Sequence, residues 1–146
     1  MRRGFVLIEV LLAICIMGVL GSLAFSRLSS SVDQQELDGA ARRMAAELRY
    51  LQQVTLNEDG SRDSYRMVFN ADRYYIANGY TIEKVIILPV SVRIYGSPST
   101  VAFSRITGGM AVGQSIQLQS KTLKKSLYVI LYPNRGRVRI DDQPAN

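Results

Sequence analysis

The chain of 146 residues contains no histidine, and its single cysteine is Cys15. A disulfide within the chain is therefore excluded, and the usual histidine and cysteine ligands of a metal cluster are missing. Cys15 lies inside a long apolar run, so we interpret it as a small apolar residue, with an intermolecular thiol contact as the alternative. The sequence also lacks a nucleophile elbow and a phosphate-binding glycine loop. These absences predict that the chain is not an enzyme and that it binds no cofactor or metal.

Acidic residues are absent from the long segment 85–140. That segment carries eight Lys/Arg residues, whereas residues 1–84 carry ten basic and ten acidic side chains, so the net charge of +6 belongs to the C-terminal half. The eight basic residues are Arg93, Arg105, Lys121, Lys124, Lys125, Arg135, Arg137 and Arg139. Hydrophobic residues make up 47% of the chain and charged residues 21%, which is typical of a folded domain.

An apolar run covers residues 5–25, with Glu9 as its only charge and Arg2 and Arg3 ahead of it. As a helix at about 1.5 Å per residue, this run would cross a hydrocarbon core about 30 Å thick. We therefore predict a transmembrane helix in a single-pass protein of the cytoplasmic membrane. The positive-inside rule predicts a cytoplasmic N-terminus and an exported C-terminal domain.

Glu9 leaves three interpretations of this segment open. A secretory signal peptide would be cut near residues 22–24 (Ser-Leu-Ala), but its apolar core would be long and would contain a carboxylate. An ordinary anchor leaves Glu9 unexplained, because a carboxylate facing lipid costs about 2–3 kcal/mol. In the third interpretation, cleavage after Gly4 creates an α-amine on Phe5. The Glu9 carboxylate can then neutralise that amine, in its own chain or in a neighbouring subunit.

The stretch RGFVLIE (residues 3–9) resembles the class III signal of type IV pilins and pseudopilins. The resemblance implies that a prepilin peptidase cuts after Gly4, that the new N-terminal Phe5 is N-methylated, and that Glu9 guides addition of the subunit to a filament. The implied partners are this peptidase, other pilin or pseudopilin subunits and the inner (cytoplasmic) membrane. After assembly the subunit would belong to a cell-surface or periplasmic filament. One departure is Val6, where the family often has threonine.

Helical periodicity continues beyond the apolar run and then gives way to strands. One helical face carries Leu37, Ala41, Met44, Leu48, Leu51 and Thr55. Alternating segments bounded by turns predict strands at 64–69, 73–77, 84–88, 91–95, 101–104, 115–119, 126–132 and 137–140. We expect an α+β, pilin-like fold in which a long N-terminal helix, transmembrane in its first half, packs on an antiparallel β-sheet domain. The predicted segments are a leader (1–4), a transmembrane helix (5–25), its amphipathic continuation (26–57) and the sheet domain (58–146).

The order of the strands and the closing GRVR (residues 136–139) resemble GspH/FimT-type minor pilins and the competence pseudopilins of Gram-positive bacteria. This resemblance implies a structural subunit of an envelope filament, in a type IV pilus, a type II secretion system or a competence pseudopilus. In FimT-like minor pilins linked to DNA uptake, such a segment is associated with DNA binding, so a DNA-binding minor pilin is the second hypothesis. The candidate DNA contacts are Lys121, Lys124, Lys125, Arg135, Arg137 and Arg139.

The residues agree with either a DNA-binding surface or a plain solvated strand. Arg137 and Arg139 are two residues apart, which places them on one face of a strand, where they can hold adjacent phosphates. Tyr128 and Tyr132 can supply a stacking surface. However, positive charge is also common on edge strands that avoid unwanted pairing, and the same arginines can face solvent or a neighbouring subunit.

Overall fold

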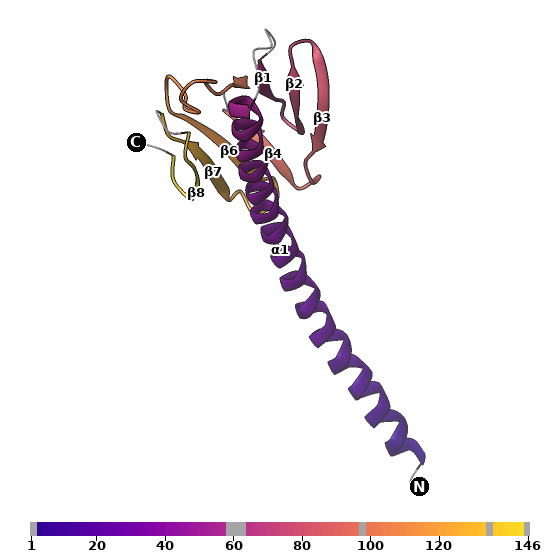
Figure 1. Ribbon diagram of the computed structural model, residues 1–146. Helices are drawn as coiled ribbons and strands as arrows, with labels where there is room; N and C mark the ends of the chain where they lie inside the picture. The colour runs from indigo at the N-terminus through magenta and orange to yellow at the C-terminus, as the bar shows by residue number, and fades with distance from the viewer. Residues whose placement is uncertain (1–2, 58–63, 97–98, 134–135, 145–146) are drawn as a thin grey trace. The chain divides into compact units, whose positions relative to one another are not determined.

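A computed structural model describes residues 3–57, 64–96, 99–133 and 136–144, without the side chains of residues 3–5 and 23–29. The chain divides into two compact units, residues 1–32 and residues 33–146, which we call the first unit and the second unit. Helix α1 (Arg3–Asn57) belongs to both units, and all of the strands belong to the second (Figure 1).

In the first unit, α1 exposes a continuous apolar surface. The described large hydrophobic side chains between Val6 and Leu20 are 51–71% exposed, and Glu9 is exposed among them. No side chain described over residues 6–22 is buried.

Within the part of the chain that the structure describes, no helix is both long enough and apolar enough to cross a membrane. The predicted transmembrane helix over residues 5–25 is therefore wrong. The single-pass location in the cytoplasmic membrane, with an exported C-terminal domain, is wrong for the same reason. The apolar run with described side chains, residues 6–22, has 17 residues and contains Glu9. At about 1.5 Å per residue it is about 26 Å long, shorter than a hydrocarbon core of about 30 Å.

In the second unit, α1 is amphipathic, as its sequence predicts. The side chains of the predicted buried face are at most 1% exposed: Leu37, Ala41, Met44, Leu48, Leu51 and Thr55. Ala40 and Ala45 complete this face, and their small size lets the helix approach the sheets closely. Arg42, Arg43 and Gln53 lie on the exposed face. Burial of this stripe is what holds the helix to the sheets.

Eight strands are described, and they form two four-stranded antiparallel sheets. The first sheet has the order β3-β2-β1-β5 and the second the order β4-β6-β7-β8. The strands of the first sheet are β1 (Tyr65–Phe69), β2 (Arg73–Asn78), β3 (Thr81–Ile87) and β5 (Thr100–Val101). Those of the second are β4 (Val92–Tyr95), β6 (Gln114–Ser120), β7 (Ser126–Leu131) and β8 (Val138–Asp141).

The fold is α+β with antiparallel sheets, but the prediction that the first half of the helix is transmembrane is wrong. The chain changes sheet between β3 and β4, where Pro89 cannot donate to a ladder and Val92 N–H donates to the Pro89 carbonyl at 3.0 Å. Both sheets are tied to the β1–β2 turn. Leu88 N–H donates to the Asp72 carbonyl at 2.9 Å, and Ile94 N–H donates to the Ala71 carbonyl at 3.0 Å.

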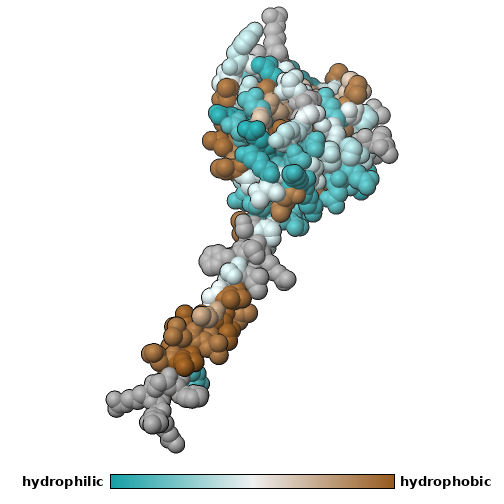
Figure 2. Space-filling model, turned by 180° about the vertical axis from the view of Figure 1, so that it is seen from behind, coloured by the Kyte–Doolittle hydropathy of each residue, from teal (hydrophilic) through white to brown (hydrophobic). Residues whose placement is uncertain are grey.

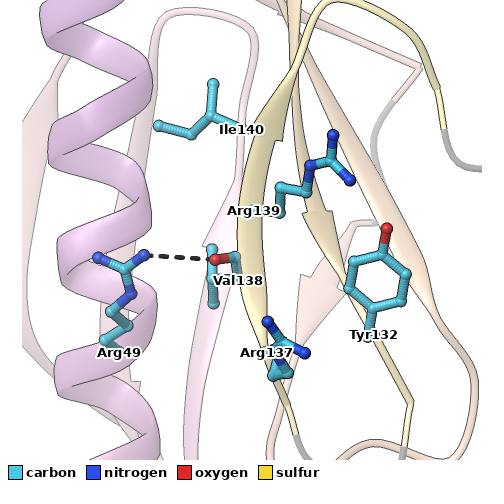
Figure 3. A pocket seen from close by; sticks show the side chains of 6 residues that line it. All are labelled: Arg49, Tyr132, Arg137, Val138, Arg139 and Ile140. Atoms are coloured by element: carbon cyan, nitrogen blue, oxygen red, sulfur yellow. Dashed lines mark hydrogen bonds between the residues drawn. The ribbon is translucent and has the colours of Figure 1, made fainter.

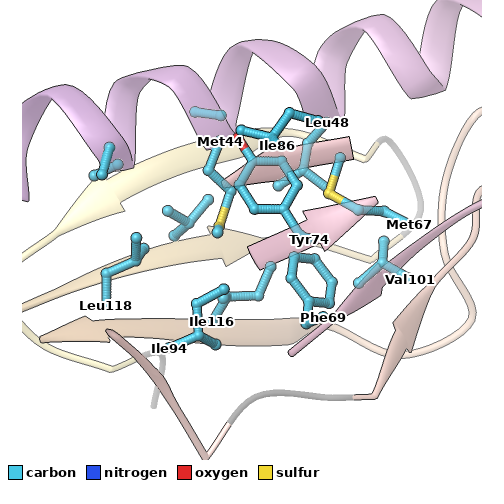
Figure 4. Packing of buried hydrophobic residues seen from close by; sticks show 14 of the residues in the cluster. Met44, Leu48, Met67, Phe69, Tyr74, Ile86, Ile94, Val101, Ile116 and Leu118 are labelled. Atoms are coloured by element: carbon cyan, nitrogen blue, oxygen red, sulfur yellow. The ribbon is translucent and has the colours of Figure 1, made fainter. Parts of the chain in front are cut away.

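One core lies beneath α1 and is shared by the two sheets (Figure 4). Tyr74 on β2 is its largest fully buried side chain and packs near Phe69, with ring centroids 6.1 Å apart. The Tyr74 hydroxyl has no hydrogen-bond partner among the described residues. Burial raises the pKa of this phenol above its usual value, and the nearby Glu47 carboxylate adds to the effect. Tyr74 is therefore neutral and acts as a core side chain.

Candidate functional site

The β7–β8 hairpin carries Arg139 on β8, with Arg137 immediately before that strand. β7 and β8 are antiparallel, with Leu131 opposite Val138 and Ile130 opposite Arg139. Tyr132 N–H extends the ladder by donating to the Arg137 carbonyl at 3.0 Å. Figure 3 shows Arg137, Arg139 and Tyr132 on the same side of this ladder, as their spacing predicts.

Arg49 on α1 joins this surface from the helix. Its Nη2 atom donates to the Val138 carbonyl at 3.3 Å, as the dashed line in Figure 3 marks. This bond satisfies a carbonyl on β8, an edge strand of its sheet. Arg49 therefore attaches β8 to α1 from the helix side of the strand, whereas Figure 3 shows Arg139 and Tyr132 on the other side of β8.

These elements enclose a groove of about 460 Å³, lined by Arg49, Tyr132, Arg137, Val138, Arg139 and Ile140. Among the described residues, its lining holds three guanidinium groups and no carboxylate. Tyr132 is 41% exposed, so part of its side chain is accessible to solvent. Guanidinium groups bind phosphate or carboxylate oxygens through paired N–H donors, and a tyrosine ring can stack on a planar group. The groove thus has the chemistry to hold an anionic ligand with a planar part.

One of the three charges is partly compensated. Arg139 Nη2 lies 2.7 Å from Asp141 Oδ2, and the two side chains are 64% and 32% exposed. An exposed pair of this kind contributes about 0–1 kcal/mol, so a phosphate can compete for the guanidinium.

Gly136 begins the hairpin's second arm and has a structural reason to be glycine. Its φ angle is +59°, a left-handed conformation that side chains disfavour. A Cβ atom here would lie 2.5 Å from the Gly108 carbonyl oxygen and 2.6 Å from Gln52 Nε2. The glycine of the GRVR segment therefore lets the backbone pass close to the Gly108 turn and positions Arg137 and Arg139 at the groove.

The predicted lysines do not join the arginines. Lys121, Lys124 and Lys125 lie in the β6–β7 turn, at the opposite end of β7 from Arg137. β7 has six residues, so the two clusters are about 20 Å apart. Lys121 Nζ is also engaged by the Val90 carbonyl. Arg135 lies outside the described residues.

The other candidate site is near the start of α1. Gly4 and Phe5 are helical, and the Phe5 side chain lies outside the described atoms. Glu9 lies one helical turn beyond Phe5 and is exposed. A carboxylate four residues after a helix position lies on the same face as that position.

Two features of the groove were not predicted from the sequence. Arg49 is far from β8 in the sequence, and no local signal connects them. The Arg139–Asp141 pair was detectable, because residues two apart on a strand share a face. No family model, curated protein or solved structure matches the chain.

Proposed function

We propose that the chain is a structural subunit of a filament of the pilin or pseudopilin type, whose precursor is cut after Gly4. The observation that carries this proposal is the exposed apolar surface of α1 over residues 6–22, with Glu9 as its one carboxylate. A continuous apolar surface of this kind needs a cover. In a filament, the same helices of neighbouring subunits cover one another.

Glu9 fits this arrangement because it can pair with an amine created by processing. Cleavage after Gly4 leaves an α-amine on Phe5, and N-methylation keeps that amine basic. An isolated carboxylate is costly among packed apolar helices, and pairing it with the amine of the next subunit removes that cost. The pair forms only when neighbouring helices have the correct axial offset. Glu9 therefore sets the register of subunit addition.

Replacing Glu9 with glutamine tests this role. Glu9→Gln preserves size and shape but removes the charge, so we expect at least a tenfold loss of the chain from sheared filaments, measured by immunoblot. Asp38→Asn is the matched control, since it removes a carboxylate from the second-unit part of the same helix, and it should leave the filament fraction unchanged. Wild-type levels of Glu9→Gln in filaments would contradict the proposal.

DNA binding is a second candidate function, and the groove at β8 is the observation that favours it. Arg49, Arg137, Arg139 and Tyr132 line one groove at the β8 edge, and no carboxylate is among the described residues that line it. A filament subunit with this groove could capture DNA for uptake. The arginines would hold phosphates, and Tyr132 would contact a base.

The double variant Arg137→Gln/Arg139→Gln tests DNA binding by the purified full chain across a salt series. Log K falls as log salt rises, and each lost phosphate contact makes this slope shallower by about 0.7–0.9. For the double variant we therefore expect a slope that is shallower by about 1.5, together with binding that is at least tenfold weaker. Lys124→Gln/Lys125→Gln removes the same charge from the far end of β7 and should change binding much less. If both double variants lose the same amount of DNA affinity, the loss is explained by net charge alone. That result would contradict a DNA-binding site at the groove.

A further inference from the structure

The second sheet has two different faces. Its core face carries buried apolar residues of β6 and β7 that belong to the core cluster: Ile116, Leu118, Leu127, Val129 and Leu131. Side chains alternate between the faces of a strand, so the residues between these point to the opposite side, which we call the outer face. Figure 2 views the molecule from behind and shows a largely hydrophilic surface on the second unit, with hydrophobic residues toward its margins.

The strand register places paired residues side by side on the outer face. The rows across the sheet are Tyr95–Gln117–Tyr128–Asp141, Ser115–Ile130–Arg139 and, beyond the strand ends, Tyr132–Arg137. Tyr95, Tyr128 and Tyr132 therefore share one face with Arg137 and Arg139. These tyrosines come from β4, from β7 and from the residue that follows β7, so the topology gathers rings that are far apart in the sequence.

The tyrosines of the outer face are accessible to a ligand. Tyr95 is 43% exposed and Tyr132 is 41% exposed, and Tyr128 is partly exposed. Ile130 lies between Tyr128 and Tyr132 on this face and outside the core cluster. Tyrosine has only two side-chain torsions, so little conformational entropy is lost when it holds a ligand. Aromatic rings arranged in this way provide a surface on which flat groups can stack.

A cavity of about 380 Å³ lies beside Tyr132. Gln114 and Ser115 line it, and each has a buried side-chain oxygen that finds no hydrogen-bond partner among the described residues. A buried oxygen without a partner is destabilising, and a ligand that donates an N–H group to it removes that cost. The exocyclic amino group of a nucleobase is a donor of this kind.

The width of the outer face favours a single strand of DNA over a duplex. Three strand spacings of about 4.8 Å separate β4 from β8 by about 14 Å, whereas the major groove of DNA is about 12 Å wide and admits a helix or a two-stranded ribbon. The four-stranded sheet therefore does not fit into the groove. In a duplex the bases are also stacked on one another, whereas a single strand offers its base faces to aromatic side chains.

We propose that the outer face of the second sheet binds single-stranded DNA, with phosphates at Arg137 and Arg139 and bases stacked on Tyr128 and Tyr132. The base at Tyr132 donates its amino group to the cavity beside it. The inference deepens the second candidate function, DNA binding, and rests on it, because it extends the groove at β8 across the sheet and identifies the form of the DNA.

Fluorescence anisotropy with the purified full chain compares one sequence of about 16 nucleotides as a single strand and as a duplex, at the same salt concentration. We expect the single strand to bind at least tenfold more tightly. A duplex that binds as tightly as the single strand would contradict the inference, although it would agree with DNA binding at the groove. Absence of binding to either form at low salt would contradict DNA binding itself and leave the filament role untouched.

Tyr128→Leu tests stacking on the outer face, because it removes the ring and keeps an apolar side chain on the strand. Single-strand affinity should fall at least fivefold, with an unchanged salt slope because no phosphate contact is lost. Tyr128→Phe keeps the ring and should bind as the wild type does. Tyr80→Leu is the matched control, since Tyr80 is 102% exposed but lies between β2 and β3 of the first sheet.

Three results with these variants would overturn the inference. Wild-type affinity of Tyr128→Leu would mean that no base stacks there. A loss as large in Tyr128→Phe would assign the effect to the hydroxyl rather than to the ring. An equal loss in Tyr80→Leu would remove any preference for the outer face.

Discussion

Replacing Gly136 with alanine is expected to lower the free energy of unfolding by about 2–4 kcal/mol. A left-handed residue with a side chain costs about 1–2 kcal/mol, and φ at Gly136 is +59°. The new Cβ would also lie 2.5 Å from the Gly108 carbonyl oxygen and 2.6 Å from Gln52 Nε2. The Gln52–Gly108 hydrogen bond would have to break or move, which adds about 1–2 kcal/mol.

Gly96→Ala is the matched control for this measurement. Gly96 has φ +54°, but a Cβ atom added there would have Gln117 Oε1, at 4.0 Å, as its nearest neighbour. It therefore carries the conformational cost without the close contact, and we expect a loss of about 1–2 kcal/mol. Urea unfolding of the full chain, followed by circular dichroism, compares the two. Equal losses would mean that the close approach to Gly108 has no energetic role.

Replacing Gly4 with valine is expected to abolish processing of the precursor. Under the proposed function, a peptidase cuts between Gly4 and Phe5, and a branched side chain at Gly4 obstructs access to that peptide bond. The uncut chain retains residues 1–4 and lacks the α-amine that Glu9 pairs with, so it should be absent from filaments.

Gly21→Val is the control for the Gly4 variant. It makes the same substitution in the same helix. A Cβ atom at Gly21 would have no other atom within 4 Å. We expect its precursor to be cut as in the wild type, as judged by intact mass after co-expression with a prepilin peptidase. Normal cleavage of Gly4→Val would contradict the assigned cleavage position.

Local pattern predicted the approximate positions of the elements of the second unit, although β3 begins at Thr81 rather than at 84 and β5 is Thr100–Val101 rather than 101–104. The apolar residues at helical spacing from Leu37 to Thr55 are the buried face of α1. The turn at residues 70–72 joins β1 and β2 as an antiparallel hairpin, and β7 pairs with the next strand, β8. These features depend on residues close in sequence, where period and turn chemistry decide the outcome.

Long-range pairing was not predictable in the same way. The sequence does not show that β5 returns to pair with β1, or that β4 pairs with β6 rather than β3, so the division of the strands into two sheets was not predicted. The position of Arg49 beside β8 depends on that same packing. The transmembrane prediction failed for a different reason. It judged residues 5–25 by length and composition alone, whereas no described helix is long and apolar enough to cross a membrane.

The intact mass of the chain purified from its host tests the central claim most directly. The account predicts loss of Met1 to Gly4 and a gain of about one methyl group on Phe5. An uncut chain would contradict the account, because Glu9 would then have no processed amine to meet. A mass corresponding to cleavage after Ala24 would contradict it as well, since the apolar part of α1 and Glu9 would be removed together.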